Sequence, residues 1–430
     1  MIRITFWNGL GFIFFTFIKS YVVIYFFGGS GFDLGIIMAL QPLARLFSMP
    51  LIAYLTDRAS KKRLVLIGSV GRTIAYIFYW FSLVVNNLNL FGAGTLIQGL
   101  LVGFFWPPFY SLISEKSFKG SRTQALATGR GKMIGYGFVI GALISIPIFA
   151  FFSFIMPENI PLIYSPLLIF AFINLIAGHR FYLKVDENLT FEKYITSLDG
   201  HNIKLPVLNE NKTTDVGTKE AHETKSNRFF NIGFITLIIA ILVTSISGTI
   251  YSPFVSAYLI ENLLIGFTET IIPIVVMIVY FPAQVFSQLL VSKVGKLLDH
   301  ISPTKSIVTI NLFKSLLIWL LVFTFTPYDF AIILIFLYLA LESNTYFIQA
   351  IMSRISIKHR GKMFGLNIWI DQLGRVIGPL IGGILWDSLA YSAPFIVSIF
   401  IGLGLIPIFI IAIKKLNFHL VEQVERDKKK

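Results

Sequence analysis

The chain has 430 residues, of which 55% are hydrophobic and only 13% are charged, and its mean hydropathy is +0.77. Soluble domains carry about 45–50% apolar and about 25% charged residues, so this composition is that of a membrane protein. The formal net charge of +14 does not indicate a nucleic-acid partner, because the basic residues flank apolar segments and do not alternate with aromatic residues. The absence of cysteine excludes disulfides and thiolate metal sites.

Twelve apolar segments have the length of about 20 residues that crosses a bilayer as a helix. The first is longer than the core of a cleaved signal peptide, about 7–15 residues, and is predicted to be a spanning helix. The segment 230–260 is long, and Pro253 is expected to break or kink it. The predicted spans cover residues 5–27, 34–55, 64–85, 92–113, 133–155, 161–183, 230–260, 266–292, 306–326, 329–354, 363–386 and 393–414.

A polar segment of mixed charge with few aromatic residues separates the two sets of six spans, and it is predicted to be a flexible linker. The expected fold class is an all-α polytopic membrane protein with twelve transmembrane helices in two pseudo-symmetric six-helix bundles. Its predicted parts are an N-terminal bundle (1–183), a cytoplasmic linker (184–228), a C-terminal bundle (229–415) and a basic cytoplasmic tail (416–430).

Lysine and arginine lie on alternate connectors, which predicts the orientation of the chain in the membrane. None of the other connectors contains lysine or arginine, and the charged residues that they do contain are acidic; they are residues 28–33, 86–91, 156–160, 261–265, 327–328 and 387–392. Because positively charged loops stay in the cytoplasm, both termini are predicted to be cytoplasmic, in a protein of the cell membrane.

Two short patterns recur in the two sets of spans. The phrase RGKMIG begins at Arg130, and RGKMFG begins at Arg360. An aspartate in the connector after the second span of each set, Asp57 or Asp299, is followed fifteen residues later by a cation, Arg72 or Lys314. The same anchors in the same order predict a parallel six-helix repeat.

The sequence resembles the major facilitator superfamily of transporters at three places. YLTDRASKKR (54–63) is similar to the family's loop between helices 2 and 3, although Ala53 and Ser60 stand where two glycines are usual. GFFWPPFYSLISE (103–115) is similar to helix 4, and RGKMFGLNIWIDQLGRVIGPLIGGILWD (360–387) is similar to helix 11. The resemblance covers both sets of spans and implies a fold in which helices 1, 4, 7 and 10 line a central cavity.

The resemblance also implies a cytoplasmic gate. In the family, the carboxylate equivalent to Asp57 is held at the N-terminus of helix 11, where free N–H groups favour a negative charge. The neighbouring cations are placed to pair with Glu115. The alternative is that these charges only fix the topology. The predicted gate residues are Asp57, Arg58, Lys61, Lys62, Arg63, Glu115, Arg130, Asp299 and Arg360.

Seven charged residues lie near the middle of predicted spans, where a charge costs on the order of 3 kcal/mol. Lys19 and Glu342 fall on helices that the resemblance places at the cavity, and they are predicted to face one another. Glu342 is the candidate for proton coupling, with a static salt bridge as the alternative. The other charges are predicted to be structural: Arg45, Arg72, Lys314, Asp371 and Arg375. Further candidate cavity residues are Tyr21, Trp106, Tyr251, Asn344, Tyr346 and Gln349.

The predicted function is that of a secondary active transporter that moves a small organic solute by alternating access, coupled to protons, either for efflux or for uptake. It is predicted to act as a monomer in the lipid bilayer without a cofactor or metal. A membrane enzyme acting on lipid is the first alternative, but the six histidines are scattered along the predicted connectors and tail. A non-transporting receptor on the same fold is the second. The chain lacks a phosphate loop for ATP.

Overall fold

The computed structural model describes residues 3–116, 133–188, 232–299, 301–355 and 360–416, and these contain helices and no strand. The helices of the first set are α1 (Arg3–Tyr21), η1 (Val22–Phe26), α2 (Gly31–Arg58), α3 (Lys61–Val84), α4 (Leu88–Val102), α5 (Trp106–Glu115), α7 (Met133–Ile155), α8 (Ile160–Ile163) and α9 (Pro166–Lys184). Those of the second set are α11 (Ile232–Tyr251), η4 (Ser252–Phe254), α12 (Val255–Leu263), α13 (Ile272–Asp299), α14 (Pro303–Val322), α15 (Pro327–Ile355), α16 (Arg360–Ser388) and α17 (Ala393–Leu416).

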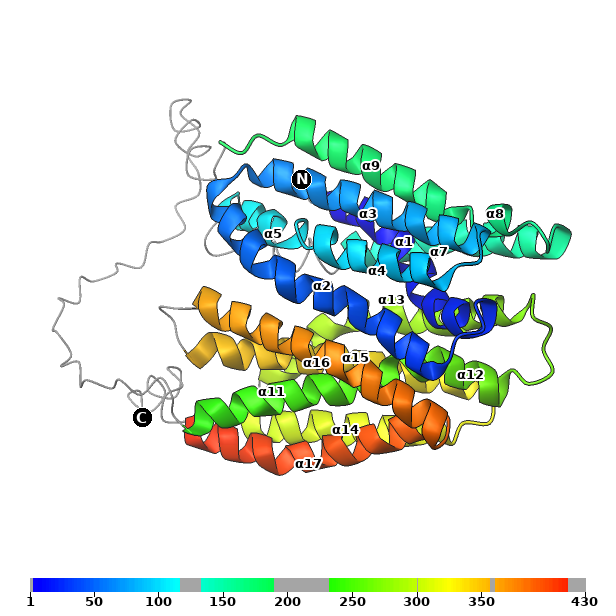
Figure 1. Ribbon diagram of the computed structural model, residues 1–430. Helices are drawn as coiled ribbons and strands as arrows, with labels where there is room; N and C mark the ends of the chain where they lie inside the picture. Colours follow the sequence, from blue (N-terminus) through cyan, green and yellow to red (C-terminus); the bar gives the residue numbers. More distant parts are fainter. Residues whose placement is uncertain (1–2, 117–132, 189–231, 300, 356–359, 417–430) are drawn as a thin grey trace.

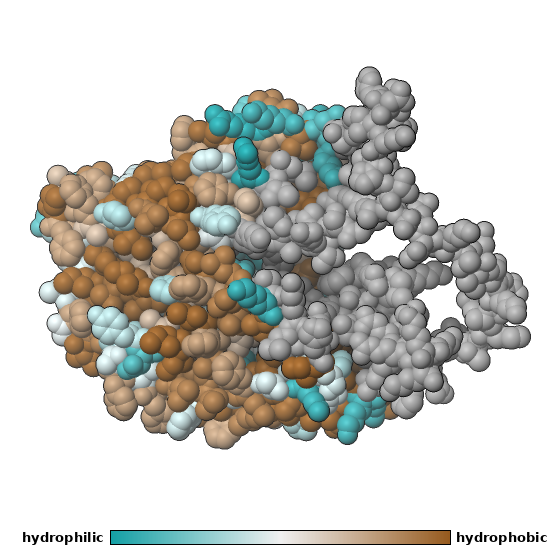
Figure 2. Space-filling model, turned by 180° about the vertical axis from the view of Figure 1, so that it is seen from behind, coloured by the Kyte–Doolittle hydropathy of each residue, from teal (hydrophilic) through white to brown (hydrophobic). Residues whose placement is uncertain are grey.

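The described helices have the length and surface of membrane spans. Eleven helical segments are long and apolar enough to cross a membrane, and α1, followed by η1, occupies the remaining predicted span. Large apolar side chains are freely exposed on the outside, among them Phe47, Phe325 and Phe400. Figure 2 shows hydrophobic residues covering most of one face of the described helices. A soluble monomer does not expose so much apolar surface, whereas lipid tails can cover it.

The helices form two bundles, which we call the N half (α1 to α9) and the C half (α11 to α17), as Figure 1 shows. The most extensive contact between the halves joins α2 and α16, and further contacts join α1 and α7 to α13. We call the end of the molecule where α1 begins and α17 ends the terminal side, and the opposite end the far side. The helices α2 and α16 lie close together at the far side and separate toward the terminal side (Figure 1).

The predicted break at Pro253 is confirmed. The helix stops at Tyr251, passes through the short 3-10 segment η4 and resumes as α12. The first helix of the N half is also irregular near its far end, where α1 turns into the π-helix η1. A second break, between α4 and α5, was missed in the sequence. Pro107 and Pro108 cannot donate to the carbonyls four residues earlier, so the chain forms turns there instead of a continuous helix.

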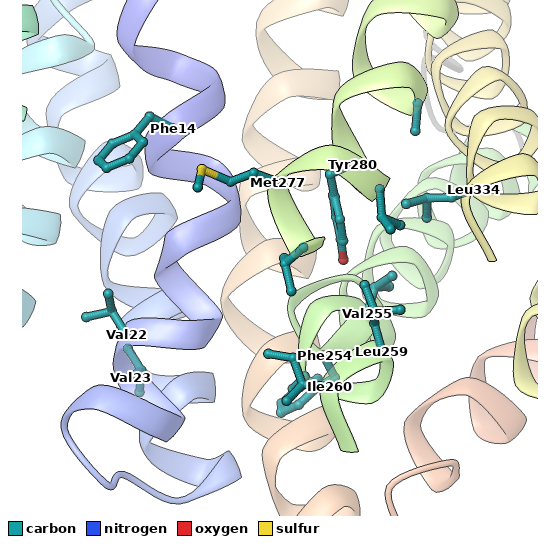
Figure 3. Packing of buried hydrophobic residues seen from close by; sticks show 14 of the residues in the cluster. Phe14, Val22, Val23, Phe254, Val255, Leu259, Ile260, Met277, Tyr280 and Leu334 are labelled. Carbon is teal, nitrogen blue, oxygen red and sulfur yellow. The ribbon is translucent and has the colours of Figure 1, made fainter. Parts of the chain in front are cut away.

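The largest buried apolar cluster joins the two halves. It contains Phe14 and Val22 from the N half and Phe254, Met277 and others from the C half. In Figure 3, Met277 extends from α13 toward α1, on which Phe14 lies. Packing between the halves is therefore apolar toward the far side, and the polar contacts described next are set into it.

Candidate transport pathway and gates

An ion pair lies near the middle of α16. Arg375 Nε is 2.7 Å from Asp371 Oδ2, one turn earlier on the same helix. Asp371 also accepts a hydrogen bond of 2.9 Å from Ser245 Oγ of α11, through its other carboxylate oxygen. The Arg375 side chain is 48% exposed although it lies near the middle of its helix. The two charged groups are thus paired with each other, and Asp371 also with a neighbouring hydroxyl, without being sealed in the core.

Two cations of the N half extend this cluster. Arg45, near the middle of α2, is close enough to Asp371 and Arg375 for their charges to act on it, and its buried Nε atom has no hydrogen-bond partner among the described residues. Lys19 is buried on α1, and its Nζ donates a hydrogen bond of 3.3 Å to Gln41 Oε1, one turn before Arg45 on α2. The charge of Arg45 also acts on Lys19.

Glu342 completes the cluster on the C half. Its half-buried side chain on α15 is close enough to Arg375 and Tyr338 for its charge to act on both. The described contacts therefore connect Lys19 to Glu342 through Arg45 and the Asp371–Arg375 pair. We call these five residues the central charge cluster. Three of its members were expected from the sequence to be structural, and the structure places them between the two residues predicted to function.

The two remaining intramembrane cations lie elsewhere, inside the separate bundles. Arg72 and Lys314 are each only 1% exposed. Arg72 donates from Nη1 to the side-chain oxygen of Asn8 at 2.8 Å and to its backbone oxygen at 3.2 Å, and its guanidinium lies over the Phe105 ring. Neither side chain reaches outward toward a membrane surface. They occupy equivalent third helices of the two halves.

The other predicted cavity residues are dispersed. Tyr21 stacks on Tyr25 near the far side, and Tyr251 is buried against Phe395 in the C half. Trp106 stacks on Tyr110 against the small apolar cluster of the N half. Asn344 is buried with its side-chain oxygen lacking a partner among the described residues. The side chains of Tyr346 and Gln349 lie outside the described residues.

At the terminal side, Arg58, Lys62 and Arg63 of the predicted gate interact with other residues of the N half. Arg58 donates to the Tyr54 hydroxyl and lies 4.3 Å above that ring. The backbone N–H of Lys62 donates to the Glu187 carboxylate, and the backbone N–H of Arg63 donates to Ser60 Oγ. Lys61, at the start of α3, is half-buried. The remaining predicted gate side chains fall outside the described residues: Asp57, Glu115, Arg130, Asp299 and Arg360.

At the far side, hydrogen bonds between described residues join the two halves. The sequence predicted a gate at the terminal side but did not predict these far-side contacts. The Asp387 carboxylate at the end of α16 accepts from the backbone N–H groups of Gly31 and Phe32 at the start of α2, each at 2.8 Å. Tyr25 donates to Glu261 Oε1 at 2.6 Å and to the Ala257 carbonyl at 3.4 Å.

A further hydrogen bond joins the halves at the break in the C half, where Ser20 Oγ of α1 donates to the Pro253 carbonyl at 2.6 Å. This bond satisfies a carbonyl of the irregular segment η4, as the predicted break at Pro253 requires. A sequence signal for the far-side contacts existed. Asp387 and Glu261 each lie in the last turn of a helix, where the helix dipole disfavours an acid, so both need a partner from another element.

Comparison with known proteins identifies the family. The family model of the Major Facilitator Superfamily matches residues 3–352 and, in a second alignment, residues 237–429. The chain belongs to the Major Facilitator Superfamily. It is therefore an integral multi-pass membrane protein and a secondary transporter of small solutes, not an enzyme. "Multidrug resistance protein 2" of Bacillus subtilis (strain 168) is 22% identical over 379 residues, which cover 87% of this chain and 86% of that protein.

Solved structures show the same superfamily fold at low sequence identity. The crystal structure of the nucleoside transporter NupG matches with a TM-score of 0.65 and 14% identity, over 96% of this chain and 98% of that one. The peptide transporter POT in complex with sulfate matches with a TM-score of 0.65 and 13% identity, over 97% of this chain and 94% of that one. The two-bundle fold expected from the sequence is confirmed.

Proposed function

We propose that this superfamily member is a proton-coupled transporter of small organic solutes, in which the central charge cluster binds the proton and contacts the solute. The observation that carries the proposal is the meeting of mid-helix charges from both halves where α2 and α16 are in contact. A charge in the middle of the membrane costs several kcal/mol unless it is partnered or hydrated, so five charged residues in one cluster favour a functional role.

The proposal gives the two acids different roles. Asp371 has an arginine and a hydroxyl within hydrogen-bond distance, and it holds Arg375 in place. The charge of Glu342, on the adjacent helix α15, also acts on Arg375, and we assign the exchangeable proton to Glu342. Protonation of Glu342 removes one negative charge near Arg375 and leaves the guanidinium to Asp371 and to a bound solute.

We further propose that the terminal side faces the cytoplasm and that the halves, residues 1–183 and 229–415, move as units. The far-side connectors, all described, contain no lysine or arginine (27–30, 85–87, 156–159, 264–271, 323–326 and 389–392). The cations Arg58, Lys61, Lys62 and Arg63 all lie at the opposite end. This asymmetry is the one that sets membrane orientation in multi-pass proteins.

We propose export as the direction of transport, with drug-like organic compounds as the first solutes to test. The support is the relative named for multidrug resistance, which aligns over most of both chains. The test is transport by the purified protein in proteoliposomes, across a panel of such compounds, with and without an imposed pH gradient. A gradient that drives net movement of one compound supports coupling, and equal movement with and without it contradicts coupling.

Replacement of Glu342 by glutamine tests the proton site. Glu342→Gln is expected to abolish the effect of the pH gradient while exchange of the solute without a gradient continues, because the amide has the shape of the protonated acid. The matched control is Glu158→Gln, which changes an exposed far-side acid and is expected to leave the pH dependence unaltered. An intact pH dependence in Glu342→Gln would show that the coupling residue lies elsewhere.

A further inference from the structure

The first backbone N–H groups of α2 have no acceptor inside the helix, as at the start of any α-helix. Ser30 and Asp33 form a capping box in which Ser30 Oγ accepts from the N–H of Asp33. The box leaves the N–H groups of Gly31 and Phe32, and both donate to Asp387 of the other half. The two halves therefore share the capping of one helix.

The fit around this contact is tight. A Cβ atom at Gly31 would lie 2.5 Å from Trp386 Cδ1 and 2.7 Å from Asp387 Oδ1, so only glycine allows the two helices to meet here. Trp386 is buried and stacks on Phe254, with ring centroids 5.2 Å apart. The buried Trp386 thus lies beside the carboxylate, while Asp387 itself is exposed, so its two charge-assisted hydrogen bonds hold the start of α2 in competition with water.

The contact spans the boundary that has to open. In a transporter of this fold, a solute that reaches the central charge cluster from the far side must pass between α1 or α2 and the C half. The Asp387 contact and the Tyr25–Glu261 contact both lie on that route. When the halves separate, the hydrogen bonds from Gly31 and Phe32 to Asp387 break. Water then takes the place of each lost partner.

We propose that Asp387 is the latch of a far-side gate: its carboxylate holds the start of α2 and sets the population of the state closed at the far side. The proposal depends on the fold and the transporter family and is independent of the proton-coupling proposal. Asp387 is a positioning residue in this role, because it acts on the equilibrium between states and not on the solute.

The absence of cysteine from the chain makes the test direct, since reporter cysteines need no background removal. Spin labels are attached at Glu158→Cys in the N half and Tyr328→Cys in the C half, both exposed at the far side, in protein reconstituted in lipid bilayers. Double electron–electron resonance spectroscopy then measures the distribution of distances between the two labels. In Asp387→Ala the ratio of long to short distances is expected to rise by on the order of tenfold, because a charged acceptor of two hydrogen bonds is lost.

The matched control is Asp329→Ala. Asp329 also caps a helix at the far side of the C half, but its partner is Thr326 of the same helix start, so its loss is expected to leave the distances unchanged. Asp387→Asn keeps the size and is expected to shift the distances less than alanine does, and it serves if the alanine variant fails to fold. Unchanged distances in both Asp387 variants would overturn the proposal, as would an equal shift in Asp329→Ala.

Discussion

The two ends of the molecule use their charged residues differently. At the far side, acids at helix ends reach across to the other half: Asp387 holds the start of α2, and Glu261 accepts from Tyr25. At the terminal side, Arg58 donates to the Tyr54 hydroxyl and the backbone N–H of Lys62 donates to Glu187, both within the N half. Among the described residues, the charged groups whose hydrogen bonds cross the boundary at the two ends of the molecule thus lie at the far side.

The largest effect on the closure of the far side is expected from a substitution at the close contact between α2 and α16. A Cβ atom at Gly35 would lie 2.4 Å from the backbone oxygen of Pro379, which cannot move without displacing α16. Gly35→Ala is therefore expected to destabilise far-side closure by about 1–3 kcal/mol, the usual cost of overpacking. The measurement is the far-side distance distribution. Gly248→Ala is the control, since a Cβ there meets nothing within 4 Å. An unshifted distribution in Gly35→Ala would contradict the packing described for this crossing.

A smaller effect is expected from the second far-side contact. Tyr25→Phe removes the hydroxyl that donates to Glu261 and leaves the ring stacked on Tyr21. The far-side closed state is expected to lose about 0.5–1 kcal/mol, less than in Asp387→Ala, because one part-buried hydrogen bond is lost and not two. Tyr136→Phe, at a side chain that is 53% exposed, is the control. If Tyr25→Phe shifted the far-side distances more than Asp387→Ala, the latch would lie at Tyr25 and the ranking would be reversed.

The smallest effect is expected at the terminal side. In this conformation Arg58 interacts with Tyr54 one turn earlier on its own helix, so Arg58→Ala is expected to change the free energy of the closed far-side state by less than about 0.5 kcal/mol. Thermal unfolding and the far-side distances together check this expectation. A shift as large as that of Gly35→Ala would mean that Arg58 joins the halves in this state as well.

The sequence predicted the spans closely because each span depends only on its own apolar residues. The predicted segments 133–155 and 393–414 match α7 and α17 almost to the residue. The break at Pro253 was predictable for the same reason, since a proline acts on its own helix. The break before α5 was equally local, and the pair Pro107–Pro108 was its sign in the sequence.

The contacts between helices were harder to predict. Nothing in the sequence indicates that Lys19 meets Gln41 or that Arg45 lies near the Asp371–Arg375 pair, because these contacts depend on how α1, α2 and α16 pack. The family resemblance directed attention to the acid of the terminal-side loop, whose side chain lies outside the described residues, and not to Asp387, which caps a helix of the other half. Its unfavourable place in the last turn of α16 was the available sign.

The most direct test of this account measures both ends in one variant. A second label pair, at Lys184→Cys of α9 and Lys414→Cys of α17, reports the separation of the halves at the terminal side, where both lysines are exposed. In Asp387→Ala, the far-side distances are expected to lengthen and the terminal-side distances to shorten, because the halves exchange one closed end for the other. Lengthening at both ends would show that Asp387 only holds the fold together, and no change at either end would show that the far side is closed by other contacts.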